Sequence, residues 1–342
     1  MLSHPASSPG GSSGEQHTAI VPIRIYYEDT DAGGLVHHSN YLRYFERGRE
    51  HVLGCAKLTE LFETSKRSFV VASVSIRYKK AARWGDALEL RTSTVVHSPY
   101  RVEFEQDIYR GDELLVEGRV FMATVQGSGG DLQLCAFPDY ILNGDIPTIP
   151  GLDRGDPANK KQLPPPKPRK AQQQWQPFGT EVSTTGRSSQ MIQTVYLDDT
   201  DFTGICYNSN YLVWMERARA NAIGIETLAR LQSEAGIGAA IHQADITFKR
   251  GAKFAEKVLI TMEARLESEY RIIFKHEVRL VAEATSRIDQ SCSYFSSDEV
   301  EGMPLLVSAE ISIVFLSAGG SGDLVKLPGE VRNMLPPPSV PT

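Results

Sequence analysis

The chain has 342 residues, of which 41% are hydrophobic and 23% charged, and it carries a formal net charge of −6. This length and composition are typical of a globular protein with two domains. The negative charge argues against nucleic acid as the main partner, and since no run of about 18 apolar residues occurs, we expect no membrane span.

The N-terminal residues 1–19 are rich in Ser, Gly and Pro, so we expect a disordered tail. They lack the apolar core of a secretory signal and the Arg-rich pattern of a transit peptide, and we therefore expect a cytoplasmic protein, with an organelle left open. The four cysteines have no CxxC spacing, which favours reduced and mostly buried thiols. No cluster of His, Cys, Asp and Glu has the spacing of zinc ligands, so we expect no metal site.

The chain contains an internal repeat. Residues 26–49 (YYEDTDAGGLVHHSNYLRYFERGR) align without a gap with residues 196–219 (YLDDTDFTGICYNSNYLVWMERAR), and half of the positions are identical. The offset between the copies grows further along the chain, and we place the extra residues of the second copy in a polar loop or hairpin at 284–302. The repeat predicts two similar domains, 20–143 and 189–328. The Pro-rich residues 144–188 predict an extended linker, and 329–342 a second Pro-rich tail.

Each copy predicts the same order of elements. A β-prone run (20–27 or 191–197) leads into a polar loop with glycine and then into a long helix, with Ser39-Asn40 and Ser209-Asn210 as expected N-caps. Apolar residues occupy a wide stripe of this helix, so we expect it to be largely buried. After it we expect only antiparallel strands: 69–78, 87–97, 101–110 and 114–125 in the first copy, and 240–248, 257–266, 271–281 and 305–316 in the second. The fold class is α+β.

One motif resembles a known family. The run Asp29-x-Asp31-x-x-Gly34-x-x-x-His38-x-Asn40-Tyr-Leu, followed by a helix with Glu-Arg-x-Arg, is similar to the opening of the 4-hydroxybenzoyl-CoA thioesterase-like hotdog proteins. Residues 78–86 (YKKAARWGD) resemble the second signature of that family, and the likeness extends over most of both copies.

The resemblance implies two tandem hotdog domains, each an antiparallel sheet wrapped around a central helix, that form an internal pseudo-dimer. It also implies an acyl-CoA thioesterase that releases a free acid and CoA. The acyl-CoA site would lie at the interface of the pair, with no cofactor other than the CoA of the substrate. Further self-association into a homo-oligomer stays open.

Thioester hydrolysis needs a nucleophile or base at the carbonyl carbon and a donor for the oxyanion. Asp31 lies where the family carries its catalytic carboxylate, and it can attack directly or activate water; from spacing alone it can equally be a turn residue. His38 matches a position near the thioester, where it can orient the acyl group or protonate the leaving thiolate. The amides at the helix start around His38, Ser39 and Asn40 can polarise the carbonyl, and Gly34 allows close approach of the backbone.

The second copy keeps Asp201, Gly204, Ser209 and Asn210, but Asn208 replaces His38. Three interpretations compete: an active site with Asp201 and Asn208, a site with a changed substrate, or a vestigial site. We favour a working Asp201 with altered neighbours. Cys206 aligns with Val36 and is interpreted as a buried apolar residue rather than a nucleophile.

Matched basic residues follow one strand in each copy: Lys79, Lys80 and Arg83 in the first, and Lys249, Arg250 and Lys253 in the second. They can hold the phosphates of CoA, or they are solvated strand ends. We expect Asp29 and His37 to be structural, and we favour pairing of Glu46 within its own helix over contact with the active-site loop. The alternative functions are an acyl-carrier-protein thioesterase and a non-catalytic acyl-binding scaffold.

Overall fold

The computed structural model describes residues 18–127, 132–144, 176–177, 189–281, 295–317 and 322–334. The first copy contains β1 (Thr18–Arg24), η1 (Tyr27–Asp29), α1 (Asn40–Leu53), α2 (Cys55–Ser65), β2 (Arg67–Tyr78), β3 (Ala87–Ser98), β4 (Arg101–Arg110), β5 (Glu113–Gln126), β6 (Gln133–Cys135) and α3 (Asp139–Leu142). After β7 (Gln176–Pro177), the second copy contains β8 (Gln190–Thr194), η3 (Leu197–Asp199), α4 (Asn208–Ile223), α5 (Ile225–Ser233), β9 (Ile237–Phe248), β10 (Lys257–Ser268), β11 (Arg271–Val281), α6 (Ser297–Gly302), β12 (Leu305–Ser317), β13 (Leu324–Val325) and α7 (Gly329–Arg332).

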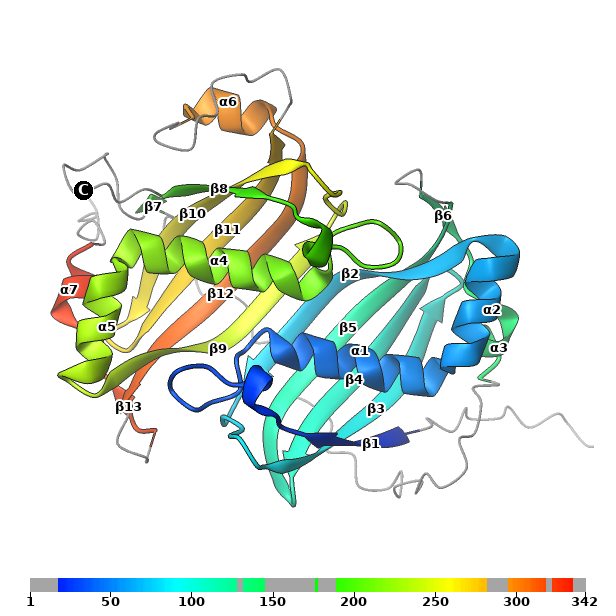
Figure 1. Ribbon diagram of the computed structural model, residues 1–342, viewed down its shortest axis with the longest axis horizontal. Coiled ribbons are helices and arrows are strands. Elements are labelled where there is room, and N and C mark those ends of the chain that lie inside the picture. The colour runs from blue at the N-terminus through cyan, green and yellow to red at the C-terminus, as the bar shows by residue number, and fades with distance from the viewer. Residues whose placement is uncertain are drawn as a thin grey trace, which may run out of the picture.

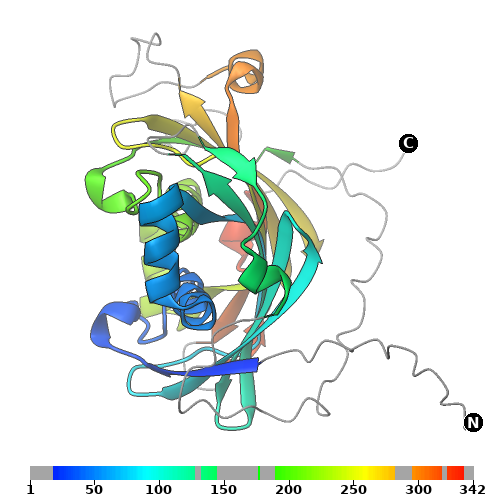
Figure 2. The ribbon, with the colours of Figure 1, turned by 90° about the vertical axis from the view of Figure 1, so that its right-hand side faces the viewer.

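The two copies share one antiparallel sheet, in the order β1-β3-β4-β5-β2-β9-β12-β11-β10-β7 (Figure 1). The join is the β2–β9 pair, which runs from Ser73 opposite Thr247 to Arg77 opposite Gln243. Within it Val74 faces Ile246, and both are buried. The long helices α1 and α4 lie on the same, concave side of the sheet (Figure 2). The predicted pair of tandem hotdog domains is therefore confirmed.

Each long helix packs closely on its own half of the sheet. In the first copy, Gly118 on β5 leaves room for the ring of Phe45, because a Cβ at residue 118 would lie 2.2 Å from the ring. Buried arginines tie the helices to the strands as well. Arg49 Nη1 donates a hydrogen bond to Gln106 Oε1 at 2.8 Å, and in the second copy Arg219 Nη1 lies 3.1 Å from His276 Nε2. These contacts hold the C-terminal half of each long helix against the sheet.

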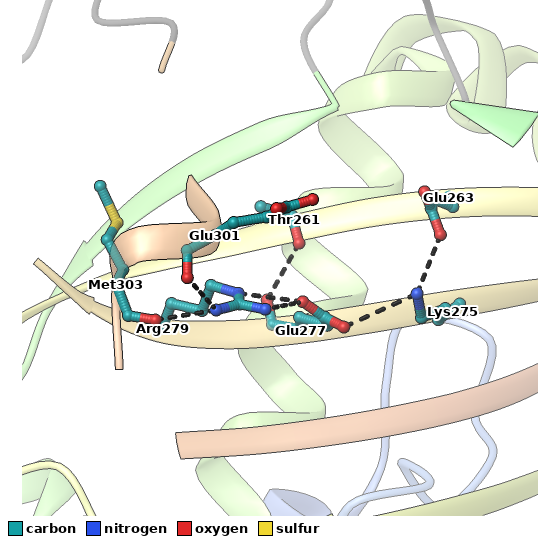
Figure 3. A network of polar contacts seen from close by, with 7 residues as sticks. All are labelled: Thr261, Glu263, Lys275, Glu277, Arg279, Glu301 and Met303. Carbon is teal, nitrogen blue, oxygen red and sulfur yellow. Dashed lines mark hydrogen bonds and ion pairs between the residues drawn. The ribbon is translucent and has the colours of Figure 1, made fainter. Parts of the chain in front are cut away.

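Part of the opposite face of the sheet is polar. On β10 and β11, Lys275 Nζ lies 3.1 Å from Glu263 and 3.6 Å from Glu277, and Arg279 pairs with Glu277 at 2.7 Å (Figure 3). Strand alternation sends the neighbouring side chains, such as His276, toward α4.

The strand predictions agree with the structure to within about three residues, but other expectations were wrong. Helices α2 and α5 follow α1 and α4 directly, after Gly54 and Gly224, where we expected only strands. Ser39 lies at the N-cap position of α1, as expected, but its side chain makes no capping hydrogen bond, and Ser209 lies inside α4, which begins at Asn208. Ser39 is engaged elsewhere, since its hydroxyl lies 2.8 Å from His37 Nδ1.

Three further differences concern the connections and the cysteines. Helix α6 falls in the stretch that we expected to be a loop, and α7, whose Val331 is buried, falls in the expected tail. Cys206 is buried, but Cys55 is exposed. The tail predictions for 1–17 and 335–342 and most of the linker prediction, 145–175 and 178–188, lie outside the described residues. None of the helices that the structure describes is long and apolar enough to cross a membrane.

Candidate active site

The loop before α1 is a tight turn built around two aspartates. Asp29 has the expected structural role: its Oδ2 accepts from the Tyr26 amide at 2.8 Å, and its carbonyl accepts from the His37 amide at 2.8 Å and from Asn40 Nδ2 at 2.9 Å. The Asn40 side chain, predicted to bind substrate, is thereby used in a hydrogen bond that holds the loop. Asn210 does the same in the second copy, since its Nδ2 donates to the Asp199 carbonyl.

Asp31 is the exposed carboxylate of this turn. Its amide donates to the Leu35 carbonyl at 2.9 Å, and its Oδ1 accepts from the Gly33 amide at 2.7 Å. Gly34 closes the turn with φ at +73°, a conformation that favours glycine. Within the described part of the chain, the Gly33 amide is the one hydrogen-bond donor to the Asp31 carboxylate, so the other oxygen can act on a substrate.

The two sequence signatures lie side by side. Val36 donates its amide to the Ala82 carbonyl at 2.8 Å, Leu35 forms a β-bridge with Arg83, and the Ala82 amide donates to the Tyr41 hydroxyl. The second copy repeats this arrangement, with Ile205 bridged to Lys253. Arg83 and Lys253 therefore lie next to the aspartate loops.

The other basic residues predicted to bind phosphate lie farther along the strand ends, beside carboxylates. Lys79 pairs with Glu117 at 2.8 Å, and Lys80 pairs with Glu113. In the second copy Lys249 is exposed, and Arg250 lies 3.7 Å from Glu256. The carboxylates on β5 compete with any phosphate for Lys79 and Lys80.

Each aspartate loop lies against the opposite copy. A Cβ at Gly33 would be 3.9 Å from Gln232 Nε2 on α5. Conversely, the Phe202 ring of the second loop contacts the Phe62 ring on α2 edge-on, with 5.1 Å between ring centroids. The short helices that the sequence did not predict therefore contact the aspartate loops of the opposite copy: α5 lies against the first loop and α2 against the second.

The first site also receives a carboxylate from the second copy. Glu216 Oε2, on α4, lies 2.5 Å from His37 Nε2 and 3.9 Å from His38 Nδ1. The Tyr78 hydroxyl donates to the His38 carbonyl at 3.1 Å. We expected His37 to be structural, and its contact with Glu216 joins the two copies.

Burial sets the protonation states in this cluster. Burial, followed by the neighbouring His37, lowers the pKa of His38 to about 3, so its imidazole is neutral at physiological pH. Burial opposes ionisation of Glu216, but the hydrogen bond from His37 and the nearby Arg219 guanidinium help to hold its pKa at about 2. The site therefore combines a neutral imidazole with an ionised carboxylate.

His37, His38 and Glu216 also bring three possible metal-ligand atoms within 4.8 Å of one another, a grouping that the sequence analysis missed. The buried Arg219 guanidinium is near enough to lower the pKa of His38 and would repel a cation. The Glu216 carboxylate already accepts from His37. This arrangement suits a hydrogen-bonded cluster better than a metal site.

The start of α1 supplies amide donors. The Asn40 amide donates to the His37 carbonyl at 2.9 Å, whereas the Ser39 amide has only a 3.4 Å contact with His37 Nδ1. Within the described residues the His38 amide has no acceptor. The amides of His38 and Ser39 are therefore available to a carbonyl oxygen.

The second loop has the same backbone and different side chains. Asp201 Oδ1 accepts from the Thr203 amide at 2.8 Å and from its hydroxyl at 2.5 Å. Glu46, which we expected to pair within α1, accepts a hydrogen bond from the Tyr207 hydroxyl of the second copy. Burial raises the pKa of the Cys206 thiol, in keeping with an unreactive side chain.

The comparisons with known proteins identify the family of the chain. A family model described as "Thioesterase-like superfamily" matches residues 26–145 and 195–335. The acyl-CoA thioesterase YbgC of Haemophilus influenzae is 38% identical over 122 residues, which are 35% of this chain and 88% of that protein. The acyl-CoA thioester hydrolase YbgC of Escherichia coli O157:H7 is 35% identical over 106 residues, 30% of this chain and 79% of that protein.

Two solved structures match nearly the whole chain. An oleoyl thioesterase (putative) from Lactobacillus plantarum has a TM-score of 0.58 at 13% identity and covers 87% of this chain and 95% of its own. The 12:0-ACP thioesterase from Umbellularia californica has a TM-score of 0.56 at 10% identity and covers 86% and 93%. At these identities the two structures support the fold alone. The chain belongs to the thioesterase-like superfamily and is a thioester hydrolase made of two tandem hotdog domains.

Proposed function

We propose that the protein hydrolyses an acyl-CoA to the free acid and CoA, with Asp31 as nucleophile or general base. The observation that carries the proposal is the exposed Asp31 carboxylate, one oxygen of which has no donor among the described residues. The loop that holds it leads directly to the start of α1, where the His38 amide has no acceptor within the same residues. The names of the YbgC relatives support acyl-CoA as the substrate.

The reaction follows from these positions. The thioester carbonyl accepts hydrogen bonds from the amides at the start of α1, which stabilise the oxyanion that forms on attack. Asp31 either attacks the carbonyl carbon and forms a mixed anhydride, which water then hydrolyses to the free acid, or takes a proton from the water that attacks the carbonyl. In both cases the C–S bond breaks, and CoA leaves as a thiolate that takes up a proton.

His38 orients the thioester in this proposal. Its lowered pKa, about 3, leaves no imidazolium at neutral pH to protonate the leaving group. A neutral imidazole can still donate one N–H to the substrate. Asp201 and Asn208 are the counterparts at the second loop, and Arg83 and Lys253, beside the two loops, are proposed to hold the CoA phosphates.

The acidic net charge of the chain favours CoA over an acidic carrier protein as the acyl donor. Release of CoA from a panel of acyl-CoAs, followed with a thiol reagent, tests the function. The double variant Asp31→Asn/Asp201→Asn should lose at least about 10²-fold in kcat at an unchanged melting temperature. Asp112→Asn, on the exposed β4–β5 turn, is the matched control and should behave as wild type. A wild-type protein that binds acyl-CoA without releasing CoA would instead be an acyl-binding scaffold.

A further inference from the structure

We infer that the two sites are unequal: Asp31 carries the turnover, and Thr203 is a positioning residue that holds Asp201 out of the reaction. The inference rests on the proposed function, since it assigns that reaction to one of the two loops. Its starting point is the alignment of Thr203 with Gly33, at the centre of two otherwise equivalent turns.

The backbones of the two turns make the same hydrogen bonds. The Asp31 amide donates to the Leu35 carbonyl at 2.9 Å, and the Asp201 amide donates to the Ile205 carbonyl at 3.0 Å. The glycines that close the turns, Gly34 and Gly204, have φ angles of +73° and +83°. The backbone therefore places the two aspartates in the same way. The different hydrogen bonds of their carboxylates come from the neighbouring side chains.

Thr203 adds a donor that Gly33 cannot supply. Both carboxylates accept one amide hydrogen bond, at 2.7 Å for Asp31 and 2.8 Å for Asp201. Asp201 also accepts from the Thr203 hydroxyl at 2.5 Å. Each of these bonds occupies a lone pair and fixes the carboxylate toward its own turn, and a bond to a charged group is among the stronger hydrogen bonds in a protein. Both bonds go to Oδ1, and within the described residues Oδ2 accepts none, so the extra bond from Thr203 restrains Asp201 by fixing the orientation of its carboxylate.

The surroundings of Asp201 act in the same direction. Asp31 is exposed, whereas Asp201 is half-buried. The residue after Asp31 is Ala32, but the residue after Asp201 is Phe202, whose ring reaches Phe62 across the boundary between the copies. The second loop is therefore anchored on both sides of the carboxylate.

The contacts between the copies are also unequal. At the first site, the His37 imidazole meets Glu216, and His38 offers a neutral imidazole beside it. The aligned groups at the second site are the Tyr207 hydroxyl, which donates to Glu46, and the amide of Asn208. The second copy thus contributes Glu216 and helix α5 to the surroundings of Asp31, while its own aspartate, Asp201, is restrained.

The test measures what remains when Asp31 is removed. Asp31→Asn should lower kcat for the best acyl-CoA at least about 10²-fold, since the residual rate comes from the restrained site. Retention of about half of the wild-type kcat would show two equal sites and overturn the inference. Failure of wild type to release CoA would overturn the proposed function itself, so the two failures are distinguishable.

The role of Thr203 is tested in the Asp31→Asn/Asn208→His background, which gives the second loop the imidazole of the first. Thr203→Val removes the hydroxyl and keeps the branched shape, and Thr203→Ser keeps the hydroxyl. The Val variant should have a kcat at least tenfold above that of the Ser variant, with KM within twofold and an unchanged melting temperature. Equal kcat values in the two folded variants, or a difference confined to KM, would refute a positioning role for Thr203.

Discussion

Substitution of Gly118 by alanine tests how closely the central helix packs on the sheet that holds the site. A Cβ at Gly118 would lie 2.2 Å from Cε2 and 2.4 Å from Cζ of Phe45, whose side chain is fully buried. Carbon atoms in contact are normally about 3.5–4.0 Å apart, so the ring must move by more than about 1 Å. Because the core around it is filled, such a shift has to displace α1 or its neighbours.

Two opposing effects set the size of the change. Overpacking of a filled core costs about 1–3 kcal/mol, while replacement of glycine by alanine inside a strand gains about 0.5–1 kcal/mol. The free energy of unfolding should therefore fall by about 1–2 kcal/mol in Gly118→Ala, measured by urea unfolding. Gly238→Ala is the matched control, because a Cβ at Gly238 on β9 meets no atom within 4 Å; it should be neutral or stabilising.

The second copy indicates how the clash can be relieved. Gly118 lies opposite Gln106 in the β4–β5 ladder, and Ala309 lies opposite His276 at the same place in β11–β12. Met215 occupies the helix position of Phe45 in the aligned repeat. Phe45→Met should therefore restore most of the stability lost in Gly118→Ala, since methionine adapts its shape. A Gly118→Ala protein as stable as Gly238→Ala would refute the packing argument.

Three further predictions concern the cluster of His37, His38 and Glu216 at the first site and the β2–β9 pair that joins the two copies. Burial holds the pKa of His38 at about 3 against 6.5 in the unfolded chain, so unfolding takes up a proton below pH 6.5 and stability should fall by about 2 kcal/mol from pH 7 to pH 5. His38→Asn should remove that loss in urea unfolding at the two pH values, and an unchanged pH dependence would contradict the assignment. Glu216→Gln should lower kcat about tenfold or more without unfolding the protein, because the hydrogen bond to His37 loses its charge; wild-type kcat would contradict a role for the second copy in the first site. Ile246→Asp places a charge opposite the buried Val74 in the β2–β9 pair, so the melting temperature should fall by several degrees or more and turnover should be lost. An unaltered melting temperature would contradict the role of this strand pair in joining the copies.

The sequence predicted the strands well because their alternation is strong and their turns are short. On β4, for example, Val102, Phe104 and Ile108 are all fully buried, as expected for one face of a strand. The helices α2 and α5 were missed because each follows a long helix after a single glycine, Gly54 or Gly224, and glycine is typical of a helix end. The available signal was the i, i+3, i+4 spacing of Leu58, Leu61 and Phe62 on α2.

The candidate site was predictable only within each copy. The motif identified Asp31, His38 and the start of the helix, since these residues are close in sequence. The contacts of His37 with Glu216 and of Tyr207 with Glu46 join residues more than 160 positions apart, and no local pattern indicates them. The capping role of Ser39 was wrong because its hydroxyl contacts His37, a tertiary choice that propensity does not encode.

The central claim is that a thioester binds between the two copies, with its carbonyl at the start of α1 and facing Asp31. A crystal structure with an acyl-CoA analogue whose sulfur is replaced by methylene tests this most directly. The account predicts that the ketone oxygen accepts hydrogen bonds from the amides of His38 and Ser39 and that the Asp31 carboxylate faces the carbonyl carbon. An analogue bound away from this boundary, or with its carbonyl turned from Asp31, would contradict it.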